Sequence, residues 1–541
     1  MSTEPGTGAA PPGTFPAASG MADDAWKEFN CRKASAHRRH GDPFPLPRLG
    51  QPRQADPLRR RLDGAFGAVN SLASAVFEKT DNPDLPLTRV QLWMMNDLGR
   101  RVSNYGEKLD NMTPDDALRD LGCGANLYSQ EANHVADLDI DQIKILSRQL
   151  DPKRASALAP PEVKAVIDNF ADKVERSTSE IEAMRASGSL VVPHWDPKLK
   201  KSLEERMKLY QRLFRCGLLT FRRRQKAKVG MFAVVKKGNK PGNSQRLIVD
   251  CRQANMLQRR PPTTRLSTPA SLSDLDFSID SLHENGYDIE SLDQFVSGIE
   301  TGDVGDCFYN FVIEHACSWF STGDIVDRAI LREHGMEVTS IFDNFVGDFT
   351  DLLEGEEVYI CFRGVPMGWS WALWLSNEIV CHQCLLATGG TENSLIRDRR
   401  TPPLVSPDKI PIGVYVDNVH TFSIDGQQSG DEMDKIAKRF QSLGIPFEVD
   451  NVCNNKTVDT LGLTFFFEDG LRVRSKKDRA WRLWLATKGI LSRRRVSGEV
   501  LRVWLGHVNY HFLLCRPLLS TLSSCYSFCH SHLGHRFPLW G

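Results

Sequence analysis

The chain has 541 residues and a mass of 60.8 kDa, with 41% hydrophobic and 25% charged residues. These values are typical of folded globular proteins and exclude a chain that is disordered throughout. We find no apolar run near the roughly 18–20 residues of a bilayer-spanning helix, and the start, Met1–Pro5, does not resemble a secretion signal. Thirteen cysteines at irregular spacing indicate reduced thiols rather than a disulfide framework. We therefore expect an intracellular protein, cytoplasmic or nuclear, that is neither secreted nor in a membrane.

The 68 basic and 68 acidic residues balance in number, but they are separated along the sequence. Residues 198–228 hold twelve Lys or Arg and two acids, and residues 471–502 hold eleven Lys or Arg and two acids. Between them, residues 274–357 hold twenty-one acids and two Arg. Such blocks fit ordinary solvated surface, and they also fit two phosphate-binding walls around a cation-binding centre. Charge does not decide between these interpretations, so the motifs must.

In chain order, residues 1–60 are rich in Pro, Gly, Ala and Arg without an apolar period, which predicts a disordered tail. The pattern over 61–197 predicts a helical extension, including one helix over 165–184. A basic amphipathic helix is predicted over 202–221.

Further along, the period changes to that of alternating strands and helices. The pattern predicts a hairpin at 231–235 with 246–250, a short strand before Asp303, and a strand at 358–362. It then predicts a helix at 370–387, a second hairpin at 412–416 with 419–423, a helix at 431–443 and a strand at 460–467. The chain beyond residue 476 is predicted to be helical and basic. This order places helices on one face of an antiparallel sheet, which is an α+β fold.

Two aspartates stand at the ends of predicted strands. Asp303 ends the strand before Gly305-Asp306, and Asp417 lies at the tip of the second hairpin. Carboxylates on adjacent strands can hold two divalent metal ions about 3.5–4 Å apart, the arrangement that serves in-line phosphoryl transfer. Mg²⁺ suits such a site because it takes a few carboxylates and completes its shell with water and phosphate. A single Asp in a turn is usually only a turn former, so the surrounding motifs carry the interpretation.

Residues 200–530 resemble the polymerase domain of reverse transcriptases. Six motifs in the family's order carry this resemblance: Phe232–Lys237 with Arg246–Arg252 and Asn255, Asp303–Tyr309, Val365–Ser370, Tyr415–Asn418, Lys456 with Thr460–Gly462, and Leu501–Tyr510. Each motif is weak by itself, and their order makes the resemblance specific.

The resemblance implies a right-hand architecture, with fingers at 198–300, a palm at 301–470 that includes part of the fingers, and a thumb at 471–535. It implies an RNA-directed DNA polymerase that uses two Mg²⁺ (or Mn²⁺) ions to add dNTPs to a primer on an RNA or DNA template. Basic residues of the thumb would track the nucleic-acid backbone: Arg472, Arg474, Lys476, Lys477, Arg479 and Arg493–Arg495. The sequence carries no signal for the oligomeric state, the natural template or the mode of priming.

The resemblance also implies roles for single residues. The metal ligands would be Asp303, the Val304 carbonyl and Asp417, with Asn418 beside them in the catalytic motif. The substrate-binding residues would be Lys236 and Arg246 for the triphosphate, Gly368 for close backbone approach, Lys456 near the leaving pyrophosphate, and Phe308 under the sugar. A ring at Phe308 would exclude a 2′-hydroxyl, which favours DNA synthesis over RNA synthesis.

Asn418 departs from the family's usual Tyr-x-Asp-Asp. The neutral amide removes one unit of negative charge from the site. Asp306 would compensate only if it pointed inward, and a regular strand turns Asp303 and Asp306 to opposite faces. Two interpretations therefore stay open, an active polymerase and a catalytically degenerate protein that binds nucleic acid on the same fold.

Other candidate sites are weaker. Cys381-His382-Gln383-Cys384 is a single pair without a second pair at zinc spacing. No Asp or Glu occurs in the 42 residues after Glu499, so we expect no ribonuclease H or integrase domain there, because both need several carboxylates for their metals.

Overall fold

The computed structural model describes residues 46, 62, 64–70, 88–104, 112–122, 135–235, 245–287, 298–452, 455, 457–467, 471–493, 495–531 and 536–538. The chain forms two compact units, residues 1–112 and residues 113–541. In the first unit, helix α3 (Arg89–Asn104) contributes Met95 to a small apolar cluster with Leu46 and Phe66. The tail predicted to be disordered, residues 1–60, lies outside the described residues except for Leu46.

The second unit is built around a five-stranded sheet. Its strands follow the order β12 (Leu395–Ile396), β13 (Ile412–Tyr415), β14 (Asn418–Ser423), β6 (Gly298–Val304) and β15 (Phe447–Val449). The β12–β13 pair is parallel and the other pairs are antiparallel. The chain therefore has the predicted α+β character, with a largely antiparallel sheet at its centre.

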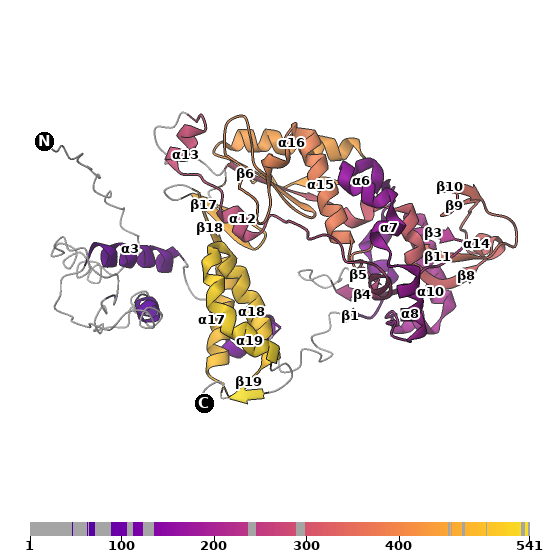
Figure 1. Cartoon of the computed structure of the whole chain (residues 1–541), viewed down its shortest axis with the longest axis horizontal. Coiled ribbons are helices and arrows are strands. Elements are labelled where there is room, and N and C mark those ends of the chain that lie inside the picture. Colours follow the sequence, from indigo (N-terminus) through magenta and orange to yellow (C-terminus); the bar gives the residue numbers. More distant parts are fainter. Residues whose placement is uncertain are drawn as a thin grey trace. The chain divides into compact units, whose positions relative to one another are not determined.

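Helices cover one face of this sheet. Val304, Val419 and Phe447 point to that face and join one buried cluster with side chains of α15 (Ala372–Thr388) and α16 (Gly426–Ser442). Figure 1 shows both helices, in orange, alongside the sheet that contains β6.

The opposite face is apolar at one end and polar at the other. Ile299 and Phe422 pack there against a three-stranded sheet of β16 (Thr457–Thr460), β17 (Leu463–Phe467) and β18 (Leu471–Ser475). Because side chains alternate along a strand, Asp303 lies on the same face as Ile299. The apolar end anchors the sheet and leaves the other end for polar side chains.

Smaller sheets and helices complete the unit. The remaining strands are β1 (Val135–Ala136), β2 (Lys153–Arg154), β3 (Leu219–Arg222), β4 (Gly230–Val235), β5 (Gln245–Asp250), β7 (Phe311–Val312), β8 (Ser321–Val326), β9 (Ser340–Asp343), β10 (Asp348–Asp351), β11 (Val358–Phe362), β19 (Arg495–Ser497) and β20 (Arg536–Pro538). The other α-helices are α4 (Pro114–Asp120), α5 (Ala155–Leu158), α6 (Pro161–Asp168), α7 (Phe170–Val174), α8 (Thr178–Ala186), α9 (Pro197–Lys201), α10 (Leu203–Arg215), α11 (Arg252–Leu257), α12 (Pro269–Ser273), α13 (Ile279–Glu284), α14 (Arg328–Glu333), α17 (Lys477–Leu491), α18 (Gly498–Phe512) and α19 (Ser523–Ser531).

Most predicted elements of this unit are confirmed. The β4–β5 hairpin, β11, α15, the β13–β14 hairpin and the basic helices after residue 476 lie where the pattern placed them. Among the described residues, none of the helices combines the length and the apolar character needed to cross a bilayer.

Four predicted elements are wrong in their extent, each because of local backbone chemistry. The helix predicted over 431–443 begins at Gly426, because the Asp425 side chain accepts from the Gln427 N–H and caps the helix there. The predicted helix over 165–184 is broken into α6, α7 and α8, because Asn169 leaves helical geometry and Ser177 starts α8 with a capping box. The helix predicted over 202–221 ends at Arg215, since Gly217 adopts a φ of +85°. The predicted strand over 460–467 is two strands, β16 and β17, joined at Leu461-Gly462.

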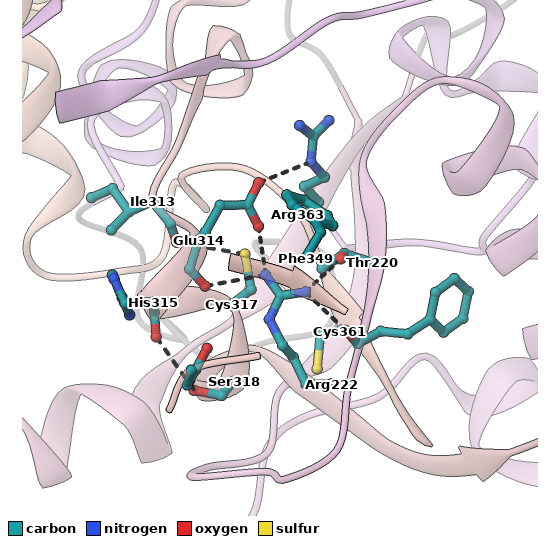
Figure 2. Close-up of polar contacts among 12 residues, drawn as sticks. Thr220, Arg222, Ile313, Glu314, His315, Cys317, Ser318, Phe349, Cys361 and Arg363 are labelled. Carbon is teal, nitrogen blue, oxygen red and sulfur yellow. Dashed lines mark hydrogen bonds and ion pairs between the residues drawn. The ribbon is translucent and has the colours of Figure 1, made fainter. Parts of the chain in front are cut away.

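A buried ion pair joins β3 to the short 3-10 helix η5 (Glu314–Trp319), which follows β7. Arg222 is 2% exposed, and its Nη2 lies 2.6 Å from Oε2 of Glu314, while Nη1 donates to the Thr220 hydroxyl at 2.6 Å. Arg363 approaches the other oxygen of Glu314 at 3.6 Å, as Figure 2 shows. The Glu314 carboxylate thus compensates charge from β3 and from the residue that follows β11, and removing Arg222 would leave the buried carboxylate with only the longer contact to Arg363.

We predict that Arg222→Met lowers the free energy of unfolding by about 3–5 kcal/mol, because it leaves Glu314 buried without its main partner. Urea denaturation measures this loss. The matched control is Lys164→Met, which breaks the exposed ion pair with Asp168 and should cost about 1 kcal/mol or less. Equal losses in the two variants would contradict the structural role of the buried pair.

Candidate active site

Asp303 is the next-to-last residue of β6, and strand pairing places it between two other motifs. It lies directly opposite Asn418 of β14 on one side and Glu448 of β15 on the other. Directly opposed side chains point to the same face of a sheet. The Val304 N–H donates to the Asp417 carbonyl at 2.8 Å. Because this bond lies beside the opposed residues Asp303 and Asn418 and not between them, these two form a non-hydrogen-bonded pair, in which the Cα atoms are about 4.5 Å apart. Two motifs that are distant in sequence therefore meet at one strand end.

Asp417 lies in a tight turn of unusual geometry. Val416 and Asp417 form the two-residue loop between Tyr415 and Asn418, which pair with each other. Val416 has a φ of +63°, whereas Asp417 has a negative φ. This is the pattern of a type II′ turn, whose first central position is usually Gly. A β-branched residue at positive φ is strained, and such strain is concentrated at functional sites.

The side chain of Asn418 makes a hydrogen bond to the neighbouring carboxylate of Asp417. Its Nδ2 donates a hydrogen bond to Oδ1 of Asp417 at 2.9 Å. The amide therefore holds one oxygen of the neighbouring carboxylate, where a second aspartate would repel it. The cation-attracting charge of this turn comes from Asp417 alone.

Asp303 is in a strongly negative environment. Its partial burial, together with the negative charges of Asp417, Glu448, Asp450 and Asp306, raises its pKa from 3.8 to about 6. A carboxylate that is hard to ionise among other acids has a strong affinity for a cation that compensates them.

Glu448 and Asp450 were not among the predicted site residues. They lie on β15 and just beyond its end, beside β6, and Asp450 also accepts a hydrogen bond from the Thr301 hydroxyl. The alternation Phe447-Glu448-Val449-Asp450 could have indicated this strand. Its position next to Asp303 could not be read from the alternation.

The donor set fits Mg²⁺. Asp303 and Asp417 offer carboxylate oxygens, and the Val304 carbonyl faces the same strand edge as its N–H, toward Asp417. Mg²⁺ is usually held by one or two carboxylates plus water and substrate phosphate rather than by a complete protein cage. The described residues contain no group of three or more His, Cys, Asp or Glu side chains arranged to hold a metal.

The Asp306 carboxylate is engaged by an ion pair with Arg148. Asp306 has a left-handed φ of +53° and begins the short helix η4 (Cys307–Asn310). Its carboxylate pairs with Nη1 of Arg148 at 2.6 Å. Strand alternation was the expected reason that Asp306 does not compensate for Asn418, whereas in the structure β6 ends at Val304 and the turn together with Arg148 directs the side chain.

Phe308 and Arg246 approach the same region from η4 and β5. Phe308 is partly buried and packs against the main apolar cluster. The Tyr309 hydroxyl donates to the Leu247 carbonyl at 3.3 Å, which ties η4 to β5. Burial raises the pKa of Tyr309, and the positive charge of Arg246, the residue before Leu247 on β5, opposes that rise. Arg246 itself is exposed.

Gly368 is held against the β4–β5 hairpin. A Cβ at this position would lie 2.5 Å from the Val249 carbonyl. Asn255 fixes the turn, because it donates to the Gly368 carbonyl at 2.9 Å and accepts from the Ser370 N–H at 2.8 Å. Packing therefore accounts for the missing side chain, and a contact with nucleotide or template stays a prediction.

Two predicted substrate-binding residues, Lys236 and Lys456, lie outside the described residues, as does Arg494 of the basic block. Several other cations of that block contact the chain itself. The Arg479 guanidinium lies 3.7 Å from the centre of the Tyr510 ring, and Arg493 pairs with Asp115 of α4 at 2.9 Å. The sequence did not predict that acidic α4 would neutralise part of this block.

No family model and no curated protein matches this sequence. Solved structures similar to the chain include a foamy viral protease-reverse transcriptase in complex with double-stranded DNA, at 13% identity and a TM-score of 0.36, covering 73% of this chain and 59% of that one. A second is the foamy viral protease-reverse transcriptase with an RNA/DNA hybrid, at 13% identity and a TM-score of 0.35, covering 73% and 45%. A third is the native prototype foamy virus protease-reverse transcriptase, at 13% identity and a TM-score of 0.28, covering 62% and 35%.

This chain thus spans less than two thirds of the length of the first of these structures. A likeness at this level carries no conclusion about activity. The activity of the chain has to be inferred from its own residues and their geometry.

The raised pKa of Asp303 predicts a pH dependence of stability. Between pH 3.8 and about 6 the folded state keeps a proton that the unfolded state has released, so the free energy of unfolding falls as pH rises through this window. Asp303→Asn removes this loss, and we expect the variant to be more stable than the wild type above pH 6 but not near pH 4. Urea denaturation without divalent ions measures the difference. The control is Asp348→Asn on exposed β10, and a difference for Asp303→Asn that does not change with pH would contradict the prediction.

Proposed function

We propose that this chain is an RNA-directed DNA polymerase, which adds deoxynucleotides to the 3′-hydroxyl of a primer paired with an RNA or DNA template. The observation that carries the proposal is the β6–β14 register, which brings Asp303 beside Asp417 and Asn418 at a polar strand end. In this proposal the central sheet is the palm, the β4–β5 hairpin belongs to the fingers, and α17–α19 form the thumb.

The reaction joins the primer 3′-oxygen to the α-phosphorus of the nucleotide. The bond from that phosphorus to the bridging oxygen breaks, pyrophosphate leaves, and the proton of the 3′-hydroxyl passes to water. Two Mg²⁺ (or Mn²⁺) ions, when bound, supply charge stabilisation at the attacking and leaving oxygens. Asp303, Asp417 and the Val304 carbonyl would hold them. Asn418 would orient the Asp417 carboxylate through its hydrogen bond.

The nucleotide would bind between η4 and the β4–β5 hairpin. Arg246, exposed on β5 next to Leu247, offers a planar fork that suits phosphate oxygens, and Lys236 would add a point charge. Phe308 is packed against the core from η4, so its ring cannot swing freely away from a sugar. A fixed ring there favours deoxynucleotides. Gly368 and Lys456 complete the proposed substrate contacts.

Asn418 also favours a second candidate, a degenerate polymerase that binds nucleic acid without synthesis. Its Nδ2 engages one oxygen of Asp417, and that oxygen would otherwise be open to a metal ion. The missing charge and the occupied oxygen both weaken cation binding. In this candidate the chain retains the polymerase fold but does not catalyse nucleotide addition.

We predict Mg²⁺-dependent extension of a DNA primer on an RNA template, with dNTPs and not rNTPs as substrates. Asp303→Ala and Asp417→Ala should each lower the rate by about a hundredfold or more, because metal binding supplies several kcal/mol of transition-state stabilisation. Gel-resolved primer extension with separate dNTP and rNTP pools measures both expectations.

The matched control is Asp348→Ala, which removes an exposed acid on β10 and should leave the rate unchanged. A wild type without synthesis contradicts the proposed activity. A wild type that uses rNTPs as well as dNTPs would identify an RNA polymerase instead.

Asn418→Asp separates the two candidates. In an active enzyme the added carboxylate should reduce the Mg²⁺ concentration needed for half-maximal extension, because the site gains negative charge. In a degenerate protein the wild type is silent and the variant gains synthesis. Titration of Mg²⁺ in the extension assay gives the answer, with Asn393→Asp as the same chemical change at an exposed position.

A further inference from the structure

The turn that carries Asp417 is held from helix α15 by one side chain. Asn377 is fully buried, and its Oδ1 accepts a hydrogen bond from the Val416 N–H at 3.1 Å. Its Nδ2 lies 3.5 Å from Oε1 of Glu378 and 3.7 Å from the sulfur of Cys381. These two contacts orient the amide with its oxygen toward the turn. The helix therefore supplies a fixed acceptor to the backbone next to Asp417.

The turn needs such support because of Val416. Its φ of +63° is adopted freely by Gly and with strain by a β-branched residue. Strained backbone persists only where the surrounding structure over-determines it. Val416 is 5% exposed, so its N–H has no access to bulk water if the acceptor is removed. Loss of the Asn377 oxygen would leave a buried donor unpaired and favour a relaxed turn.

The position of Asp417 is set by three hydrogen bonds from three directions. Its carbonyl accepts from the Val304 N–H of β6 at 2.8 Å, and its Oδ1 accepts from Asn418 at 2.9 Å. The bond between Asn377 and Val416 is the third, and it acts on the backbone N–H of Val416, the residue just before Asp417. Without it, the other two bonds still hold Asp417, but the backbone at Val416 can relax.

We infer that Asn377 is a positioning residue for Asp417. It keeps the Val416-Asp417 turn in its strained form, so that the Asp417 carboxylate stays beside Asp303. The effect on reaction rate rests on the proposed polymerase function. The effect on the turn is a property of the fold and is measurable without activity.

A double-mutant cycle with Asn377→Ala and Val416→Gly in the full chain tests the inference. We expect Asn377→Ala to lower kcat by about 10–100-fold, because a small displacement of a catalytic group has effects of this size. The KM for dNTP should change by about twofold or less, since Asn377 is buried away from the nucleotide. In that background Val416→Gly should recover about tenfold in kcat, because Gly adopts positive φ without strain.

The matched control is Ser376→Ala. Ser376 is the neighbouring residue on α15 and is fully buried, and its hydroxyl has no hydrogen-bond partner among the residues that the structure describes, so kcat should not change. Two results would overturn the inference. In one, the kcat losses of Asn377→Ala and Val416→Gly multiply independently. In the other, Asn377→Ala raises KM as much as it lowers kcat.

The same four proteins are compared by urea denaturation. If Asn377 supports the strained turn, Asn377→Ala lowers the unfolding midpoint less in the Val416→Gly background than in the wild type. Equal shifts in both backgrounds would overturn the inference. A wild type without polymerase activity would contradict the proposed function, and the urea cycle alone would then decide on Asn377.

Discussion

The register between β6 and β14 is the constraint on which the candidate site depends. Because side chains alternate along a strand, a slip by one residue would turn Asp303 to the helix-covered face and bring Val304 to the site. Glycines let β6 approach both of its neighbouring strands closely, β14 at Gly298 and β15 at Gly302. A Cβ at Gly298 would lie 2.2 Å from the Ser423 carbonyl, and one at Gly302 would lie 2.6 Å from the Phe447 ring. The packing of Ile299 and Phe422 at the apolar end of β6 and β14 therefore also fixes which residues stand opposite each other at the acidic end, Asp303 and Asn418.

Stability and function conflict at the tip of the β13–β14 hairpin. Val416 breaks the local preference of its turn, and Asp303 is placed among other acids that raise its pKa. Each feature costs stability by itself. Such local inconsistencies are expected at functional sites, where the rest of the fold supplies the compensation. Here the compensation comes from hydrogen bonds of helix α15, of β6 and of Asn418 to the turn formed by Val416 and Asp417.

The buried ion pair between Arg222 and Glu314 helps to place these elements. Arg363, which also approaches Glu314, follows β11 directly, and its N–H donates to the Leu218 carbonyl at 2.8 Å. The next residues form the turn held by Asn255 and then α15. The path from the ion pair to Asn377 is therefore one short stretch of chain, fixed at both ends by buried polar contacts.

Local patterns in the sequence predicted a strand before Asp303 and the β13–β14 hairpin of the central sheet, but not β12 or β15. They also identified Asp303 and Asp417 as a candidate pair, because period-two alternation and turn residues are local signals. They failed where a short cap decides, as at Ser177, which divides the helix predicted over 165–184. Only the tertiary structure decided that Glu448 lies beside Asp303 and that Asn377 contacts Val416. Neighbours across strands and between a helix and a turn depend on how layers pack, and a buried Asn in a helix gives the same local pattern whether or not it holds a distant turn.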